Sequence, residues 1–579
     1  MCSSHYISSV PLSLSSVRRR VESFLAENGL RIAPLDYYAI VTRNEDSDEI
    51  LAGGGLEGNV MKCIAVSESA RAEGLTNKLV SHLIGVAMDK GHQSVKVFTK
   101  PGNQGIFSSL GFQLLATSPE AILMENGFTG LKSYLKYLSG LRKDGRNGAI
   151  VMNANPFTKG HRYLVEQAAA QVDNLYVIAV KEDRSRFPYV ERLAMIKAGT
   201  ADLGNVTVCE GSDYAISAAT FPTYFLKKLD DASDTQMTLD IDLFSNHIAP
   251  ALGVSVRFAG SEPVDPLTGR YNQLMSELLP QKGMEFVEIQ RLEDGDAAIS
   301  ASRLRNSLDI GMSENALRLA YQTSIPYLVA DLAQRALERE LDTTPKPGLV
   351  DKDDRGAHQD MDHGTMVRSI LALRPFFTSL ALAAVDGIDP DKVRETGIEA
   401  EKAMLMATCG VNTHKGALFC LGLSAAVVSY LLARDGKVGR DEFRRVLAQT
   451  AEGIPSAKDT HGADAVNTYR VPGALESARR AYPELFSDWL PYYNSLSHDQ
   501  YREHKTLLKI MTMLDDTNIL HRNGLEGLRK VKADAASILA DFSVDRLSEL
   551  NNEYKASNTS PGGSADMLSL TIYISNFIN

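Results

Sequence analysis

The sequence predicts a multidomain protein with an α/β front domain, an α/β domain built on a parallel sheet, and an all-α C-terminal domain. The chain has 579 residues, whereas one domain usually holds about 100–200. From residue 148 to 308, strand-like runs alternate with helical patterns, which is typical of a parallel sheet covered by helices. Beyond residue 327, long helical patterns dominate. We therefore expect domains at 1–140, 148–325 and 327–579.

The front domain is expected to mix strands and helices. Strands are predicted at DYYAIVTR (36–43), EILAGG (49–54), MKCIAV (61–66) and SVKVFTK (94–100), and a helix at LTNKLVSHLIGVAMDKG (75–91). GGGLEG (53–58) matches G-x-G-x-x-G, but a strand rather than a helix follows it. We therefore expect a hairpin turn there and not a dinucleotide site.

The two later domains differ in their periodicity. Strands of the second are predicted at AIVMNA (149–154), LYVIAV (175–180), VTVCE (206–210), VSVRFAG (254–260) and MEFVEI (284–289). Helices of the third are predicted at 326–341, 417–433, 504–516 and 566–577. The uncharged run 417–433 is shorter than the roughly 20 residues of a membrane helix. We expect it to be a buried core helix, with no membrane as partner.

Composition and charge exclude several functional classes. Hydrophobic residues make up 44% of the chain and charged residues 23%, so it is neither largely disordered nor collagen-like. The net charge is −11, and a nucleic-acid binder needs a basic footprint, so no nucleic-acid partner is expected. The five cysteines form no C-x-x-C pair, which argues against a zinc site or a disulfide framework. The N-terminal residues predict no signal peptide, and we expect a cytoplasmic protein.

A nucleotide site is predicted where the strand AIVMNA runs into NPFTKGHRYLVEQAAAQ. Asn155 and Pro156 end the strand, and a helix is expected to start near Gly160 and His161. The N–H groups and the dipole of a helix N-terminus attract anions, and glycine lets a phosphate approach closely. His161 and Thr158 offer side-chain donors at the same place.

A second signature lies in ISASRLR (299–305). Ser300 and Ser302 are expected to cap a helix, and Arg305 to reach phosphate oxygens. The ordered pair T-x-G-H and I-S-x-S-x-x-R resembles the H-x-G-H and I-S-S-T-x-x-R signatures of adenylyl- and cytidylyltransferases, which implies a Rossmann-like domain. The rival P-loop pattern, G-x-x-x-x-G-K-[ST], occurs nowhere in the chain.

A closer resemblance covers residues 1 to about 325. NANPFTKGHRYLVEQAA, EDRSRFPYVER (182–192), YAISAATFPTYFLK (214–227) and GSEPVDPLTGRYN (260–272) are similar to the ligase family that acetylates citrate lyase. The resemblance implies that acetate and ATP form acetyl-AMP and pyrophosphate. The acetyl group then passes to the prosthetic thiol of the lyase's acyl carrier protein subunit.

By this resemblance, His161 and Thr158 hold the α-phosphoryl oxygens, while Ser302 and Arg305 hold the leaving pyrophosphate. Mg²⁺ is expected on the phosphates. The wider set of expected ATP-binding residues comprises Asn155, Phe157, Gly160, Ser300 and Arg192, with Lys227 as a weaker candidate.

The front domain resembles GNAT-type acetyltransferases through RAEGLTNKL (71–79) and FSSLGFQLLA (107–116). In that family an R-x-x-G-x-G/A stretch binds the pyrophosphate of coenzyme A at a helix start. Arg71 and Gly74 match it, whereas Thr76 replaces the usual small residue. The resemblance implies a domain that docks the dephospho-CoA arm, serves structurally, or acts as a second transferase.

Polar clusters interrupt the helical domain at TPKPGLVDKDDRGAHQDMD (344–362), GVNTHKGALF (410–419), DDTNILHRNGLEG (515–527) and SPGGSADMLSL (560–570). Taken as local structure, they are caps and turns. Together they supply glycine-rich helix starts with Lys and Arg for a polyphosphate, and carboxylates for Mg²⁺. They are similar to the triphosphoribosyl-dephospho-CoA synthase family across about 329–579.

This resemblance implies that the 2′-hydroxyl of 3′-dephospho-CoA attacks the ribose C1′ of ATP, and that adenine leaves. Lys415 is the expected catalytic residue, and Asp362, Asp516 and Asp566 are the expected metal ligands. The expected ATP-binding residues are Asn412, His414, Arg522, Gly562, Gly563 and Ser564. The base is open among Glu401, Asp360, Asp362, Asp516 and Glu526. RVPGALESA (470–478) departs from the family's Arg-Gly-Glu-Ala stretch and displaces its glutamate to Glu476.

The sequence thus predicts a bifunctional enzyme whose second activity makes the precursor of the arm that the first acetylates. Two other interpretations stay open. One is a coenzyme-A-type adenylyltransferase with a non-catalytic helical domain, and the other is a scaffold of the lyase complex without turnover. Intact NPFTKGH, ISASRLR and GVNTHKG argue against the scaffold.

Overall fold

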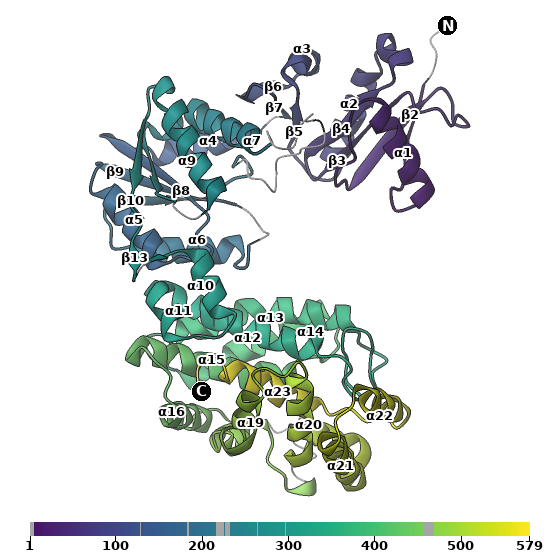
Figure 1. Ribbon diagram of the computed structural model, residues 1–579, viewed down its shortest axis with the longest axis vertical. Coiled ribbons are helices and arrows are strands. Elements are labelled where there is room, and N and C mark those ends of the chain that lie inside the picture. Colours follow the sequence, from purple (N-terminus) through teal and green to yellow (C-terminus); the bar gives the residue numbers. More distant parts are fainter. Residues whose placement is uncertain are drawn as a thin grey trace. The chain divides into compact units, whose positions relative to one another are not determined.

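The computed structural model describes residues 5–127, 129–181, 185–215, 225, 232–262, 265–295, 297–455 and 468–578. The chain divides into two compact units. Unit 1 comprises residues 1–154 and 160–298, and unit 2 comprises residues 155–159 and 299–579. Each unit is described by itself below (Figure 1).

The front part of unit 1 is a mixed sheet with the strand order β1-β2-β3-β4-β5-β7-β6. Its pairs are antiparallel except for β4 with β5. The strands are β1 (Tyr6–Ser9), β2 (Tyr37–Thr42), β3 (Ala52–Glu57), β4 (Val60–Val66), β5 (Ser94–Thr99), β6 (Gln113–Thr117) and β7 (Ile122–Gly127). The helices are α1 (Ser15–Glu27), η1 (Glu68–Glu73), α2 (Leu75–Asp89), η2 (Pro101–Asn103) and α3 (Gln104–Ser109).

The hairpin turn expected at 53–58 is wrong, because Gly53 to Gly55 lie inside strand β3. A Cβ on Gly53 would come within 2.5 Å of the Tyr38 hydroxyl, and one on Gly55 within 2.5 Å of the Tyr37 carbonyl oxygen. These glycines therefore allow the neighbouring strand to pack closely against β3. The turn follows at Gly58, which has a positive φ of 55°.

The second part of unit 1 is a wholly parallel sheet with the strand order β10-β9-β8-β11-β12. Its strands are β8 (Asn147–Met152), β9 (Asn174–Ala179), β10 (Val206–Cys209), β11 (Val254–Gly260) and β12 (Glu285–Ile289), and β13 (Glu293–Asp294) pairs separately with β14 (Ala297–Ala298). The helices are α4 (Gly130–Leu141), α5 (Lys159–Ala169), α6 (Tyr189–Thr200), α7 (Ala232–Leu243), η3 (Phe244–Ile248), α8 (Ala249–Leu252), α9 (Pro266–Leu278) and η4 (Pro280–Lys282). Figure 1 shows α5 and α6 on one side of this sheet and α4, α7 and α9 on the other.

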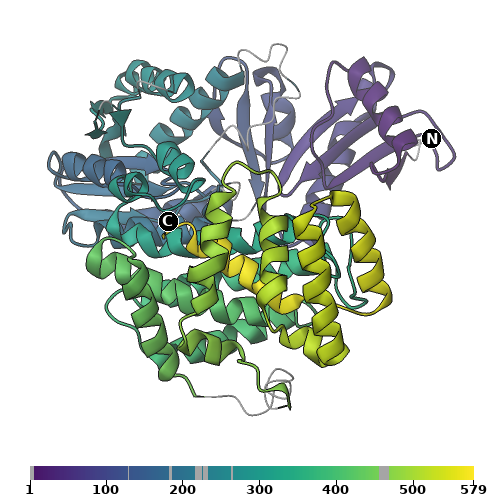
Figure 2. The ribbon, with the colours of Figure 1, turned by 60° about the horizontal axis from the view of Figure 1, so that its bottom comes forward.

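Unit 2 is helical, as the sequence predicts. Its elements are α10 (Ala301–Leu308), α11 (Glu314–Leu319), η5 (Gln322–Ser324), α12 (Ile325–Asp342), α13 (His363–Ala383), α14 (Pro390–Ala407), α15 (Lys415–Asp435), α16 (Arg440–Glu452), α18 (Ala474–Arg479), η6 (Leu485–Trp489), α19 (Leu490–Ser495), α20 (Arg502–Met513), α21 (Thr517–Ala540), α22 (Val544–Ala556) and α23 (Gly562–Ile574). Figure 2 shows α23, in yellow, running among the green helices.

The apolar helix α15 lies in the core of unit 2, where it packs against α12, α13, α14 and α23. Helices α13 and α15 are long and apolar enough to cross a membrane by length and composition alone. Burial inside the protein covers 44% of the apolar window in α13 and 78% of that in α15. A burial of 78% is typical of the core helix of a globular protein, and α15 therefore is the buried core helix that the sequence predicts.

Candidate functional sites

The first signature follows the central strand of the parallel sheet. The strand order reverses at β8, since β9 and β10 extend to one side of it and β11 and β12 to the other. Ligands of open α/β sheets bind at such a switch point, beyond the carboxyl ends of the strands. Helix α5 begins at Lys159, which places Gly160 and His161 in its first turn.

The residues just before α5 belong to unit 2 and are held there by several contacts. The Thr158 backbone forms a bridge with Ala320, and the Ser324 hydroxyl donates a hydrogen bond of 2.8 Å to the Phe157 carbonyl. The buried Phe157 ring packs edge-on against Tyr321, with ring centroids 5.7 Å apart. Phe157 thus packs in the core, and Thr158 is also almost fully buried, at 1% exposure.

The second signature forms the start of α10. Ser300 caps this helix, since its hydroxyl accepts a hydrogen bond of 3.1 Å from the Arg303 N–H. Ser302 does not cap the helix but accepts a hydrogen bond of 3.0 Å from Arg305 Nη2. Arg305 Nη1 donates to the carbonyl oxygen of Asn155. This bond joins the second signature to Asn155, just before the first signature, and both residues belong to unit 2.

Arg192 lies in α6 and is fully buried. Its guanidinium donates to the backbone carbonyls of Phe187, Asn153 and Val180, at 3.0, 2.8 and 2.9 Å. These bonds tie α6 to the segments that follow β8 and β9. Lys227, like much of the 214–227 motif, lies outside the described residues.

The expected coenzyme A residues of the front domain lie on its surface. Gly74 has a positive φ of 70° and ends η1 directly before α2. The Arg71 side chain is 65% exposed and lies 3.8 Å from Glu68, which is itself exposed. Arg71 is thus accessible at the start of a helix of 15 residues.

In unit 2, the structure reveals a buried ionic cluster that the sequence patterns do not indicate. Lys346, 1% exposed, donates from Nζ to the Glu340 carboxylate at 2.5 Å and to its backbone carbonyl at 2.7 Å. The Lys346 N–H is accepted by the buried Asp351 carboxylate at 3.0 Å. Burial raises the pKa of Glu340 in spite of the adjacent ammonium. The only signal in the sequence is a lysine between two prolines, TPKPG, which is equally typical of an ordinary loop.

His414 is buried directly before the first turn of α15. Its Nδ1 lies 2.7 Å from the Ser369 hydroxyl, which accepts a hydrogen bond from Thr413. Its Nε2 has no partner in the described part of the chain. Burial, aided by the charge of Lys346, lowers the pKa of His414 to about 3, so the imidazole is neutral at pH 7.

Polar side chains from other segments surround the start of α15. Asn412 accepts from the Lys415 N–H at 3.4 Å, and Lys415 Nζ lies 2.5 Å from Glu401. The Asp566 carboxylate accepts from the backbone N–H of Ala417. It also approaches Gly416 so closely that a Cβ there would lie 2.0 Å from its Oδ2. Any side chain at position 416 would therefore displace Asp566.

The start of α23 is held by Asp516. This buried carboxylate caps α21 by accepting from the Asn518 N–H, and it also accepts from the N–H and the hydroxyl of Ser564, at 2.8 and 3.0 Å. A Cβ on Gly563 would lie 3.0 Å from Asp516 Oδ1. Burial raises the pKa of Asp516, and burial together with the charges of Asp516 and Glu340 raises that of Asp566.

The other sequence candidates lie in different surroundings. Asp362 caps α13 through the N–H and hydroxyl of Thr365 and pairs with Arg355 at 3.3 Å. Arg522 is exposed and donates to Asn558 at 3.2 Å. Asp360 lies 3.8 Å from His358, while Glu526 and Glu476 are exposed. Among the described residues, no three of His, Cys, Asp and Glu are placed to hold a metal ion together.

These observations describe a two-part protein. The first signature follows the central strand of a parallel sheet, and the second unit gathers polar side chains at the helix starts of an all-helical fold. Residues 147–328 match the family model described as citrate lyase ligase C-terminal domain. Residues 326–579 match the model described as ATP:dephospho-CoA triphosphoribosyl transferase.

Individual relatives divide the chain in the same way. The citrate (pro-3S)-lyase ligase of Escherichia coli K12 is 43% identical over 296 residues, which are 50% of this chain and 83% of that protein. The ligase of Haemophilus influenzae is 41% identical over 295 residues, 50% of this chain and 88% of that protein. The 2-(5''-triphosphoribosyl)-3'-dephosphocoenzyme-A synthase of Haemophilus ducreyi is 34% identical over 314 residues, 48% of this chain and 96% of that protein.

Among solved structures, NadR protein in complex with NAD and AMP-PNP covers 54% of this chain and 78% of its own, with 10% identity and a TM-score of 0.23. That score is too low to carry an argument. The relatives are decisive: the chain belongs to the citrate lyase ligase family in its N-terminal half and to the triphosphoribosyl-dephospho-CoA synthase family in the remainder. It is a bifunctional enzyme.

Proposed function

We propose that the first activity joins acetate to ATP and passes the acetyl group to the prosthetic thiol of the citrate lyase acyl carrier protein. An acetate oxygen attacks the α-phosphorus, pyrophosphate leaves, and enzyme-bound acetyl-AMP remains. The thiol then attacks the acetyl carbonyl carbon and AMP is released. The observation that supports the site is the hydrogen bond from Arg305 of the second signature to the carbonyl of Asn155, just before the first signature.

Positioning and charge neutralisation are the main demands of this chemistry. His161 and the backbone of Gly160, in the first turn of α5, would hold the α-phosphoryl oxygens. Arg305 and Ser302 would hold the pyrophosphate, since Ser302 is exposed and Arg305 is half-buried at the start of α10. For Phe157, Thr158, Ser300 and Arg192 we propose a positioning role, because their described contacts lie within the fold.

We propose that the second activity couples the 2′-hydroxyl of 3′-dephospho-CoA to C1′ of the ATP ribose, with release of adenine. Lys415 and the helix starts at 415–417 and 562–564 would hold the triphosphate. The neutral His414 would donate or accept through Nε2. Asn412 and Arg522 would contribute at the rim of this site.

We propose that Mg²⁺ binds at this second site. Asp566 and Asp516 are carboxylates whose buried charges oppose each other, and a divalent cation would offset that repulsion. Mg²⁺ bound by them and by the phosphates would neutralise the charge of the triphosphate. Asp362 already pairs with a cationic side chain, Arg355, so we do not assign it to the metal.

The front domain is proposed to have a GNAT-like fold and a supporting role. Tyr214, in the loop after β10, donates to Glu125 of β7 at 2.5 Å, and Lys96 of β5 lies 3.9 Å from the centre of the Tyr214 ring. These contacts fix the loop of the ligase part to the front sheet. Arg71 and Gly74 remain available to dock the dephospho-CoA arm. We further propose domain limits near 140, 148, 325 and 327, and a cytoplasmic location.

Product analysis tests both activities on the full chain. With Mg-ATP and acetate we expect acetyl-AMP and pyrophosphate, and with Mg-ATP and 3′-dephospho-CoA we expect free adenine. His161→Ala should abolish the first reaction and spare the second, because one lost donor to the transition state costs about 2.7–4 kcal/mol. Pyrophosphate release that needs no acetate would instead indicate an adenylyltransferase, and a folded His161→Ala protein with normal acetate activation would refute the site.

A further inference from the structure

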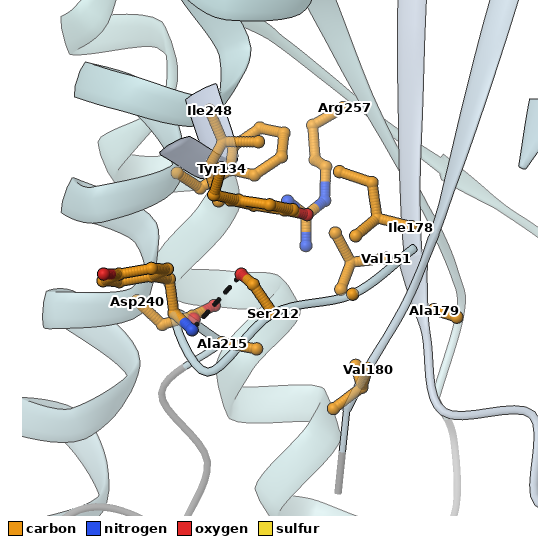
Figure 3. A pocket seen from close by; sticks show the side chains of 13 residues that line it. Tyr134, Val151, Ile178, Ala179, Val180, Ser212, Ala215, Asp240, Ile248 and Arg257 are labelled. Atoms are coloured by element: carbon orange, nitrogen blue, oxygen red, sulfur yellow. Dashed lines mark hydrogen bonds between the residues drawn. The ribbon is translucent and has the colours of Figure 1, made fainter. Parts of the chain in front are cut away.

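A small pocket lies inside unit 1 at the carboxyl end of the parallel sheet, on the face covered by α4, α7 and η3 (Figure 3). Val151 from the end of β8 and Ile178 from the end of β9 form one apolar wall. Phe244 and Ile248 of η3 form another. Its volume of about 20 Å³ exceeds only slightly the space needed for one water molecule. The pocket therefore accepts small groups only.

Arg257 brings a positive charge into this apolar pocket. It is only 4% exposed, and Figure 3 shows its side chain pointing from β11 into the pocket. Its guanidinium carbon lies 4.0 Å from the centre of the Phe244 ring. Its Nε has no hydrogen-bond partner among the described residues. A buried guanidinium donor without an acceptor is unfavourable, so this group is prepared for an anionic acceptor.

The other polar groups of the pocket are already engaged. The Tyr134 hydroxyl donates to the Glu210 carbonyl at 3.1 Å. The Asp240 carboxylate accepts from the Tyr271 hydroxyl, which itself also contacts Arg257. The Ser212 hydroxyl accepts from the Tyr214 N–H at 3.4 Å, as Figure 3 shows. Within the described lining, the Arg257 Nε–H is thus the donor that lacks an acceptor.

We propose that this pocket binds the short-chain monocarboxylic acid of the ligase reaction. Arg257 pairs with the carboxylate, and Val151 and Ile178 contact the methyl group. The inference rests on the proposed first activity and names the residues that select its acid. The position is suitable, because the pocket lies at the carboxyl ends of β8 and β9, and the segment after β8 leads into α5, the helix that carries His161.

The size of the pocket would also set the specificity. The additional methylene of propionate would push its methyl group into Val151, Ile178 or Phe244, whereas the methyl group of acetate only contacts this wall. One methylene in a hydrophobic pocket is worth about 10–200-fold in specificity. Truncation of Val151 should therefore admit the longer acid, which gives the proposal a test by gain of function.

The test is acid-dependent exchange of pyrophosphate into ATP, measured on the full chain with acetate or propionate. Arg257→Met should raise the KM for acetate about tenfold or more and leave the KM for ATP within about twofold, with Arg257→Lys intermediate. Val151→Ala should shift the ratio of kcat/KM for propionate over acetate about tenfold toward propionate.

Two matched variants serve as controls. Arg146→Met removes an exposed arginine that pairs with Glu285 at 2.7 Å, and Val206→Ala truncates a valine at the start of β10. Both lie at the amino end of the sheet and should change neither KM nor the acid preference.

The outcomes distinguish a failure of the proposed acid pocket from a failure of the proposed ligase activity. If the parent protein shows no acid-dependent exchange, the proposed ligase activity itself fails. If the parent is active but the acid preference of Val151→Ala stays unchanged, the pocket is not the acid site. An unchanged KM for acetate in Arg257→Met would likewise exclude the pocket as the acid site. Should Arg257→Met fail to fold, Val151→Ala alone still decides.

Discussion

Arg305 of α10 donates a hydrogen bond to the backbone carbonyl of Asn155, in the segment that leads into the first nucleotide signature. The same guanidinium bonds to the Ser302 hydroxyl, so its second nitrogen is also oriented. One side chain thus fixes the loop of the first motif relative to the helix of the second. This arrangement makes Arg305 both a positioning residue for Asn155 and the proposed partner of pyrophosphate.

Arg305→Lys should therefore lower acetate-dependent pyrophosphate release about 100-fold, since lysine cannot make both bonds in a fixed plane. Adenine release with 3′-dephospho-CoA should stay normal. Arg318→Lys is the matched control, because Arg318 is an exposed arginine on the neighbouring α11. Equal losses in both variants, or a loss of both activities, would point to a general destabilisation instead.

Lys415 at the start of α15 is expected to hold the triphosphate of ATP. Lys415→Ala should slow adenine release and raise the KM for ATP by about tenfold or more, since a charged hydrogen bond contributes about 1.5–3 kcal/mol. Acetate activation should be unaffected. The control is Lys402→Ala, which removes an exposed lysine that pairs with Glu399 on α14. Pyrophosphate without adenine as the product of this unit would contradict the assignment.

The low pKa of His414 predicts that unit 2 becomes less stable as the pH falls. Its folded-state pKa of about 3 lies below the ordinary value near 6.5. As the pH falls from 6.5 toward 3, the unfolded chain binds a proton at this residue and the folded chain does not. The free energy of unfolding should therefore fall by up to about 1.4 kcal/mol per pH unit from this group.

His414→Asn should remove that contribution, because the asparagine oxygen can replace Nδ1 as the partner of Ser369 without titrating. Urea unfolding between pH 4.5 and 7.5 measures the slope in both proteins. His498→Asn, at an exposed position of the same unit, controls for the loss of a histidine as such. Parallel pH curves for His414→Asn and the parent would exclude a strongly depressed pKa.

Fragments test the domain limits. The fragment 1–325 should retain acetate activation but melt at a lower temperature than the ligase part of the full chain, by about 5 °C. The reason is that residues 299–325 pack on the C-terminal helices. The Met312 N–H donates to the Asn576 carbonyl at 2.8 Å, and Arg335 pairs with Asp309 at 3.1 Å. Differential scanning calorimetry measures the loss.

The complementary fragment 326–579 should release adenine by itself, because its core of α12, α13, α15 and α23 is contained within it. Loss of both activities in soluble fragments, with retention in the full chain, would place the functional boundary elsewhere.

Local sequence patterns predicted most elements because burial in this fold follows simple periods. The strands at 149–154, 175–180, 206–210, 254–260 and 284–289 agree with β8 to β12 within a few residues. Their apolar runs are what a parallel sheet covered on both faces requires. The hairpin turn expected at 53–58 was wrong because a run of glycines gives no periodic pattern of apolar residues. Glycine is required there because the neighbouring strand packs too closely for a side chain.

The sequence by itself determined the two families, the positions of several helix starts and the change from α/β to all-α architecture. These properties depend on residues that are close in the sequence, where the spacing along the chain fixes the local geometry. Only the tertiary structure decided that Arg305 reaches Asn155, that Lys346 is buried against Glu340, and that Arg257 points into a pocket. Such contacts join segments distant in sequence. Their energies depend on burial and on the partners that the fold brings together, and no local pattern records either.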